Sequence, residues 1–384
     1  MSQSALDVRY ALIGALSLAL AMGIGRFAFT PLLPMMREDG LINIMDGGYL
    51  ASINLFGYLL GALFVTKLSC SPKILLRFSL LTVGISTIAM GLTGDFYLWL
   101  MLRFVCGISS ALILVLVSKY YLKHLTVTFQ TCVFSGVGGG ILIAGLLTLL
   151  FMVYRIDSAE SWVLIGIASL IVGFWLYLRI GSEIPSVFPQ LLQKKSQRSP
   201  FDWPIVIAYG AMGMGYIIPA TYLPMMAREI INSPMIFGWI WPIFGAATFM
   251  SILLSVKVQK RYSNRQLWAA SQLIMATGLF LPVVYPHIIT IIIAGLGVGG
   301  TFMIITMAGM KEAHRIATPD DVMRHIAALT TSFATGQMLG PLLAGYLFEQ
   351  THSFALSLIM ASATLIITAV ILLASRSKKK VVHS

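Results

Sequence analysis

Two arginines interrupt long apolar stretches, and these are the residues best placed for chemistry. Arg26 is the only charge in residues 11–36, and Arg103 lies within the apolar run 96–119. At about 1.5 Å per residue, both lie roughly 6–8 Å from their span centres, toward the same side. A charge in hydrocarbon costs at least about 2.5–3.5 kcal/mol, so it usually faces an interior or a cavity. We expect both to face one aqueous cavity, where a guanidinium could hold a carboxylate or phosphate.

The carboxylates leave these arginines without a clear partner. All Asp and Glu residues fall in predicted loops or at the ends of predicted spans. Asp46 and Asp95 are the nearest in sequence, and they are candidates for proton coupling or gating. The alternative to an anion site is structural, with Arg26 and Arg103 paired to these carboxylates or to helix-end carbonyls. The residue types leave both interpretations open.

A sequence repeat surrounds Arg26 and relates the two halves of the chain. Residues 22–36 read Met-Gly-Ile-Gly-Arg-Phe-Ala-Phe-Thr-Pro-Leu-Leu-Pro-Met-Met, and residues 212–226 read Met-Gly-Met-Gly-Tyr-Ile-Ile-Pro-Ala-Thr-Tyr-Leu-Pro-Met-Met. An internal repeat of about half the chain length predicts two similar structural units. Tyr216 stands in the second copy where the first has Arg26, so the copies have diverged at a charge.

The repeat also carries prolines, and other polar or aromatic residues accompany it. Because proline removes a backbone donor, we expect the first and seventh spans to be broken or kinked and to serve as gates. The four prolines are Pro31, Pro34, Pro219 and Pro224. Further candidates for contact with a substrate are Phe29, Asn54, Tyr216, Tyr222 and Gln337. Aromatic rings would stack on a substrate and amides would hydrogen-bond it, although ordinary helix packing also explains each of these residues.

Composition places the chain in a lipid bilayer. Of its 384 residues, 58% are hydrophobic and 10% are charged, whereas a soluble protein carries roughly 25% charged residues. The sequence lacks the extended alternation of apolar and polar residues that would indicate a membrane β-barrel. Three cysteines without CxxC spacing argue against a disulfide framework or a zinc site, so we expect no metal and no cofactor. His314 and His325 flank Asp320 and Asp321, and we interpret that segment as a solvated loop helix.

Twelve apolar segments are long enough to cross a membrane as helices. They are residues 10–34, 47–68, 74–93, 96–119, 127–151, 161–180, 204–226, 236–257, 266–285, 287–310, 326–348 and 354–374. A polar stretch at 181–203 divides six from six. We therefore predict an all-α membrane protein with an N-terminal six-helix bundle at 1–180, a cytoplasmic linker at 181–203 and a C-terminal bundle with a basic tail at 204–384. Because its repeat copy is internal, we interpret the first segment as a retained span, not a signal peptide.

The distribution of Lys and Arg predicts the orientation. Between the predicted spans, most basic residues fall on the side of the two termini, and only Arg37, Arg155 and Arg228 fall on the other. Basic residues favour the cytoplasmic side, so we expect both termini in the cytoplasm of a bacterium and the spans in its inner membrane. This topology explains the net charge of +12 without a nucleic-acid partner.

These features resemble the major facilitator superfamily (MFS). Arg103-Phe-Val-Cys-Gly107 resembles its Arg-x-x-x-Gly signature, with Cys106 in place of the usual Gln. The spacing Gly136-x-x-x-Gly140 resembles the Gly-rich signature of its exporters, although the usual Pro is missing there. The loop after the second span lacks the acidic residue of the superfamily pattern. The stretch Gly-x-Gly-Arg-Phe-Ala-Phe-Thr-Pro-Leu-Leu-Pro is similar to the YbfB/YjiJ-like branch of bacterial transporters.

The resemblance implies a function and a place for the site. In this superfamily the first, fourth, seventh and tenth spans line a central cavity, and substrate binds near the midplane between two halves. We expect a monomeric secondary active transporter, not an enzyme, that moves a small anionic or zwitterionic organic solute by alternating access. The alternative is proton-coupled efflux of neutral or hydrophobic compounds, as in multidrug exporters. A membrane-embedded enzyme is a further alternative, but it would need a His/Asp or Ser/His pair at membrane depth, and the sequence lacks one. A sensor that kept the fold is another alternative, and it would bind a ligand without transporting it.

Overall fold

The computed structural model describes residues 3–65, 70–122, 125–181, 201–258, 261–317 and 321–375. Throughout these ranges the regular elements are helices, and no strand occurs among them. The helices are α1 (Gln3–Leu18), η1 (Ala19–Ile24), α2 (Phe29–Glu38), α3 (Ile44–Phe64), α4 (Pro72–Leu92), α5 (Phe96–Tyr120), α6 (Val127–Val153), α7 (Ser158–Arg179), α8 (Trp203–Ile230), α9 (Pro234–Phe237), α10 (Ile240–Val258), α11 (Asn264–Val284), α12 (Ile288–Ile316), α13 (Val322–Thr351) and α14 (Ala355–Ala374).

These helices make the predicted membrane fold. Eleven segments of the described chain have the length and hydropathy of membrane spans, with α1, η1 and α2 counted together and α9 joined to α10. The twelfth span is α13, whose 30 residues are less apolar because they include several Thr, Ser and Gln residues. The prediction of an all-α membrane protein with twelve spans is therefore confirmed.

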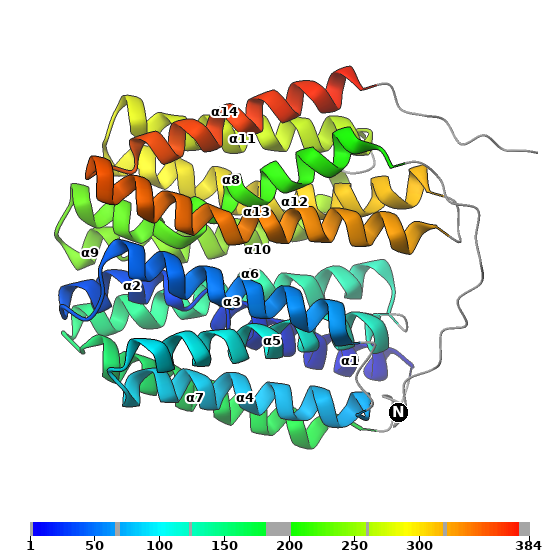
Figure 1. Ribbon diagram of the computed structural model, residues 1–384. Coiled ribbons are helices and arrows are strands. Elements are labelled where there is room, and N and C mark those ends of the chain that lie inside the picture. Colours follow the sequence, from blue (N-terminus) through cyan, green and yellow to red (C-terminus); the bar gives the residue numbers. More distant parts are fainter. Residues whose placement is uncertain are drawn as a thin grey trace, which may run out of the picture.

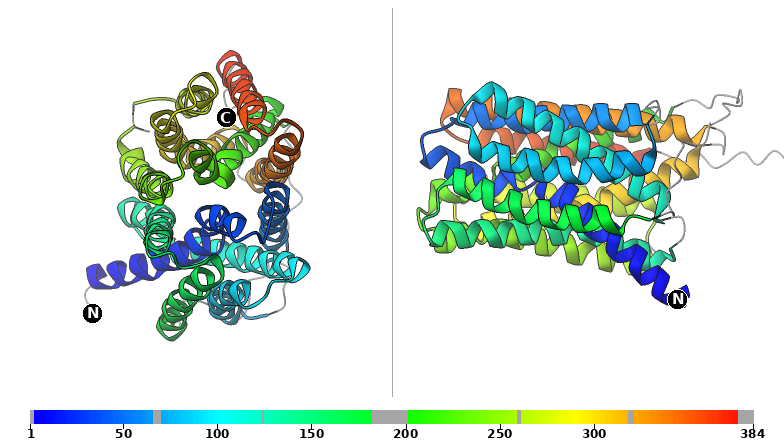
Figure 2. Two further views of the ribbon diagram at one scale, coloured as in Figure 1. Left: turned by 90° about the vertical axis from the view of Figure 1, so that its left-hand side faces the viewer. Right: turned by 90° about the horizontal axis from the view of Figure 1, so that it is seen from below.

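The chain forms two bundles, α1–α7 and α8–α14, that lie side by side with their helices running between two common ends (Figures 1 and 2). Helix α3 packs on α13, α6 packs on α10, and α2 packs on α8, so these pairs make the interface between the halves. We name the two ends by a residue near each. The Arg37 end, where α2 finishes, is on the left in Figure 1, and the Arg265 end, where α11 begins, is on the right.

The first span is broken where the sequence carries Arg26. Helix α1 passes into the π-helix η1, and residues 25–28 form a turn before α2 begins. In this stretch the N–H of Gly25 donates to the carbonyl of Leu20 at 2.9 Å, five residues back instead of four. Such π-type segments inside α-helices are frequent at functional sites. The break leaves carbonyls near Arg26 free to accept hydrogen bonds from side chains.

The prolines of the repeat accompany different backbones in the two spans. Pro31 lies in the first turn of α2, four residues after Phe27, so its missing N–H and its ring disfavour a continuous helix through residues 25–28, and Pro34 lies inside α2. Helix α8 runs without interruption through Pro219 and Pro224. The first span is therefore broken and the seventh is one continuous helix, so the two copies of the repeat differ in backbone as well as in charge.

Glycines on α6 bring the neighbouring helices close, as their spacing predicts. A Cβ atom on Gly23 of η1 would lie only 2.4 Å from the backbone of Gly140. A Cβ atom on Gly138 would lie 2.3 Å from the backbone N of Phe249 on α10, in the other half. Small residues thus bring α6 against both η1 and α10.

The segment with the two histidines, predicted as a solvated loop helix, is more buried than expected. Helix α12 continues to Ile316 and α13 begins at Val322, so most of that segment is helical. His325 is buried, with its ring 5.2 Å from that of Phe201, so the prediction of a solvated segment is wrong there. The described residues contain no group of three or more His, Cys, Asp or Glu side chains that could hold a metal. Asp320 and the basic linker residues within 182–200 lie outside the described residues.

Candidate functional site

Arg26 lies at the interface between the two halves. It is 6% exposed, and its Nη2 donates a hydrogen bond of 2.7 Å to the hydroxyl of Tyr216. The Nε2 of Gln337 donates to the same hydroxyl at 2.6 Å. The guanidinium also lies over the rings of Phe27 and Tyr58, with centroids 5.0 and 5.2 Å away. Three candidate residues from the sequence thus meet at one point, but the Nε of Arg26 has no hydrogen-bond partner among the described residues.

Arg103 lies beside Arg26 and is bound to the broken backbone. Its guanidinium donates to the carbonyls of Gly25 and Arg26 at 3.3 Å each, and to that of Leu50 at 3.4 Å. Asn54 donates to the carbonyl of Arg103 at 2.8 Å and to that of Gly25 at 3.4 Å. The break in the first span therefore provides acceptors for the side chains of Arg103 and Asn54. The two arginines lie together, as expected from their similar depth.

A small cavity lies against both arginines. Its volume is about 20 Å³, which is enough for about one water molecule. The lining residues come from both halves: Arg26, Phe27, Phe29, Thr30, Ala51, Asn54, Leu55, Arg103, Ile217, Ala220 and Thr221. No carboxylate is among them. The expected shared cavity is therefore present, but in this conformation it is water-sized and carries two cationic side chains without an anionic one.

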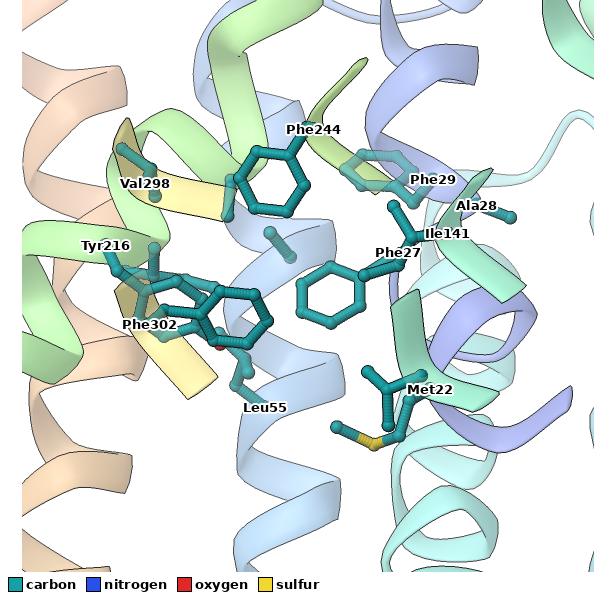
Figure 3. Close-up of a cluster of buried hydrophobic side chains, with 14 of the residues drawn as sticks. Met22, Phe27, Ala28, Phe29, Leu55, Ile141, Tyr216, Phe244, Val298 and Phe302 are labelled. Atoms are coloured by element: carbon teal, nitrogen blue, oxygen red, sulfur yellow. The ribbon is translucent and has the colours of Figure 1, made fainter. Parts of the chain in front are cut away.

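Aromatic rings fill the space between the halves around this cavity. Figure 3 shows Phe27 from the first half facing Tyr216, Phe244 and Phe302 from the second. The ring of Tyr216 is parallel to that of Phe302, with centroids 5.1 Å apart. It is also parallel to the ring of Phe333, 5.8 Å away on α13. The site thus combines cationic groups with stacked aromatic faces.

Two other aromatic candidates lie on the Arg37 side of this site. The guanidinium of Arg103 lies 4.9 Å from the ring centroid of Phe29. The hydroxyl of Tyr222 is within hydrogen-bond distance of the carbonyls of Pro341, at 3.0 Å, and of Ile44, at 3.3 Å. Because Ile44 belongs to the first half, Tyr222 contributes to the contact between halves.

The two carboxylates nearest to the arginines in sequence are used as helix caps. Asp46 makes a reciprocal capping box with Asn43 at the start of α3. Asp95 accepts the N–H of Leu98 at 2.7 Å and caps α5. The structure therefore leaves Arg26 and Arg103 bonded to a hydroxyl and to carbonyls, with neither aspartate as a hydrogen-bond partner.

Two crossed ion pairs, which we did not predict from the sequence, join the halves at the Arg37 end. Arg37 pairs with Glu229 of the other half, and Arg228 pairs with Glu38 at 3.1 Å. Arg228 also donates to the carbonyl of Pro34 at 2.6 Å. The signal was in the sequence, because an Arg-Glu dipeptide follows the repeat in both halves. Each arginine pairs with the glutamate of the other copy.

Residues related by the repeat also meet each other directly. Arg26 contacts Tyr216, and the hydroxyl of Thr30 donates to the carbonyl of Ala220 at 2.6 Å. Both pairs are 190 residues apart, which is the repeat offset. The two copies of the motif therefore face each other across an approximate twofold axis that runs through the site.

Comparison with known families agrees with this architecture. The family model described as "Uncharacterised MFS-type transporter YbfB" matches residues 18–373. The chain belongs to the YbfB family of MFS transporters. Two relatives are each 24% identical over 353 residues, covering 82% of this chain and 81% of the relative. They are an "Uncharacterized MFS-type transporter" of Yersinia pestis (strain Pestoides F) and one of Yersinia pseudotuberculosis serotype IB (strain PB1/+).

Membership of the YbfB family identifies the general function. The protein is a multi-pass membrane protein and a secondary transporter that moves small molecules, and the family implies transport instead of catalysis. Transporters of this superfamily bind substrate near the midplane between their halves. The Arg26 cavity lies between the halves of this YbfB-family chain.

Proposed function

We propose that the protein transports a small organic anion by alternating access, and that Arg26 binds the anionic group. The observation that carries this proposal is the Nε of Arg26, a buried donor with no hydrogen-bond partner in the part of the chain that the structure describes, on a cavity that no carboxylate lines. Leaving a buried charged donor unpaired is costly. A carboxylate of the substrate would satisfy Nε and Nη2 together, which is the paired geometry that guanidinium favours.

The same contact connects binding to movement. Tyr216 already accepts a hydrogen bond from Nη2 of Arg26, and in this proposal an anion that takes Nε and Nη2 together displaces the hydroxyl from that nitrogen. That exchange removes a hydrogen bond between the halves and replaces it with substrate. A ligand changes a conformational equilibrium only through its differential affinity for the two states, and here the substrate competes directly with an interhalf contact. Arg103 serves as a positioning residue, since it holds the carbonyls of Gly25 and Arg26 in place.

The orientation of the chain follows from its basic residues. We place the Arg37 end outside and both termini in the cytoplasm of a bacterium, because the predicted loops of the Arg265 end carry most of the lysines and arginines. The crossed pairs of Arg37 and Arg228 then close the outer side. Outward opening requires both pairs and the Arg26–Tyr216 bond to separate.

Proton-coupled export of neutral hydrophobic compounds is the second candidate, and the stacked rings around Tyr216 favour it. A thermal-shift experiment separates the two. Purified protein is titrated with benzoate and with benzamide, its neutral isostere. At 100 times its dissociation constant, a ligand that binds only the folded state adds about 2.7 kcal/mol of stability. We expect benzoate to stabilise the protein and benzamide to have little effect.

The decisive variant is Arg26→Gln, with Arg77→Gln as its matched control. Arg77 also has a buried Nε without a partner among the described residues, and it also lies over an aromatic ring, that of Tyr177. It is on α4 and does not line the interhalf cavity. Benzoate stabilisation should vanish in Arg26→Gln and persist in Arg77→Gln. If benzamide stabilises as well as benzoate, or if Arg26→Gln keeps the benzoate shift, the anion proposal is wrong and the exporter becomes the better account.

A further inference from the structure

A second cavity, larger than the first, lies within the C-terminal half at the Arg37 end. Its volume is about 240 Å³. Its walls are largely apolar and come from five helices and the α11–α12 and α13–α14 turns: Met226, Glu229, Ile230, Pro282, Val283, Pro286, Ile291, Phe348, His352, Ser353, Phe354, Ala355 and Leu358. It is separate from the Arg26 cavity, with which it shares no lining residue. Glu229 supplies the single carboxylate of this wall.

The protein itself shows which group this wall recognises. The guanidinium of Arg37, which comes from the other half, pairs with Glu229. It also lies over the ring of Phe348, 5.9 Å from its centroid. Both Glu229 and Phe348 line the cavity. An aromatic face and a carboxylate each attract an organic cation, and here the two together already hold the guanidinium of Arg37.

We propose that this cavity binds a small amphipathic organic cation, such as a primary alkylammonium. The ammonium group takes Glu229 and the face of Phe348, and the alkyl chain lies among Pro282, Leu358 and their neighbours. The charge of the wall excludes the equivalent carboxylate, and a neutral alcohol lacks the ion pair. This site does not depend on the identity of the transported substrate.

The position of the cavity makes such a cation a regulator of opening. Its ammonium competes with Arg37 for Glu229, so binding weakens one of the two crossed pairs that hold the halves together. Another wall residue, Phe354, packs against the ring of Tyr222 at 5.2 Å, and the Tyr222 hydroxyl contacts the carbonyl of Ile44 across the interface. Because coupling between two equilibria is reciprocal, a cation in the cavity favours separation at the Arg37 end.

The test uses hexylammonium as the probe, with 1-hexanol and hexanoate as chain-matched controls, and measures binding to the full-length protein in lipid nanodiscs by titration calorimetry. We expect hexylammonium to bind saturably, and 1-hexanol and hexanoate not to do so. Glu229→Gln should abolish it. Glu38→Gln is the matched control and should retain binding. This substitution removes the other crossed pair, but Glu38 does not line the cavity.

Two more variants distinguish this site from nonspecific partitioning. Arg37→Gln removes the internal competitor and should tighten hexylammonium binding about two- to fivefold, the range for an exposed ion pair. Ala355→Leu fills the cavity without changing a charge and should weaken binding. Equal binding of 1-hexanol, retained binding in Glu229→Gln, or no binding of hexylammonium to the parent protein would each overturn the proposal. None of these results depends on whether benzoate binds at Arg26.

Discussion

The hydroxyl of Tyr216 is the atom on which the proposed anion site can be tested most sharply. Tyr216→Phe removes the shared acceptor of Arg26 and Gln337 but keeps the ring between Phe302 and Phe333. Hydrogen bonds to charged groups contribute about 1.5–3 kcal/mol in soluble proteins, whereas interhelical bonds in membranes average about 0.6 and reach about 1.7 kcal/mol. Two such bonds are lost, so we expect unfolding free energy to fall by about 1–3 kcal/mol.

The same substitution should strengthen anion binding. Without the hydroxyl, Nη2 and Nε of Arg26 are both free, and benzoate no longer displaces a competitor. If the lost competition is worth about 0.7–1.4 kcal/mol, the benzoate dissociation constant falls about three- to tenfold. A merely structural tyrosine would not produce this combination of lower stability and higher affinity.

The assay combines thermal melting by tryptophan fluorescence with benzoate titration of the parent and the variant. Tyr209→Phe is the matched control, since Tyr209 is equally buried on α8 and also contacts Phe333, but no contact joins it to Arg26. It should leave benzoate affinity unchanged. An affinity of Tyr216→Phe equal to or weaker than the parent value would show that the hydroxyl does not compete with the anion, and the proposed exchange would be refuted.

Three further predictions address packing, closure and substrate shape. Gly23→Ala places a methyl group against the backbone of α6 and should reduce the yield of folded protein in size-exclusion chromatography, whereas Gly300→Ala, with open space around it, should not. Arg37→Glu alone sets two carboxylates together at the Arg37 end, so a cysteine introduced at that end should react faster with a thiol label. The exchanged double variant Arg37→Glu/Glu229→Arg should restore closure and slow this labelling. Benzoate should bind about three- to tenfold more tightly than cyclohexanecarboxylate, because aromatic stacking contributes about 0.5–1.5 kcal/mol, and equal affinities would contradict a role for the stacked rings.

Much of the architecture could be predicted because lipid simplifies the sequence pattern. Length and hydropathy identified the spans, and the repeat predicted two related halves. The depth of Arg26 and Arg103 along their spans predicted that they would lie near each other, as the bond from Arg103 to the carbonyl of Arg26 shows. Their roles in binding remain predictions.

What could not be predicted is the rotation of each helix about its axis. Spans that are apolar all round do not show which face meets the other half, so the bond between Arg26 and Tyr216 was not foreseen. The difference between the two spans could not be predicted from their prolines either, because α8 continues through Pro219 and Pro224 without a break. Arg37 and Arg228 were used only to assign topology, although the Arg-Glu dipeptide that each begins could have indicated the crossed pairs.

The approximate twofold axis through the repeat gives the divergence at Arg26 a physical reason. In an isologous interface, a residue near the axis meets its own copy. Two copies of the first half paired in this way would set Arg26 against a second Arg26, and two like charges would face each other at membrane depth. The crossed dipeptides tolerate such self-pairing, because each arginine meets a glutamate. With Tyr216 at the facing position, the second charge is replaced by an acceptor. A single chain with two unequal halves can therefore place one unshared cation on its own symmetry axis, which a symmetric dimer of identical halves could not do.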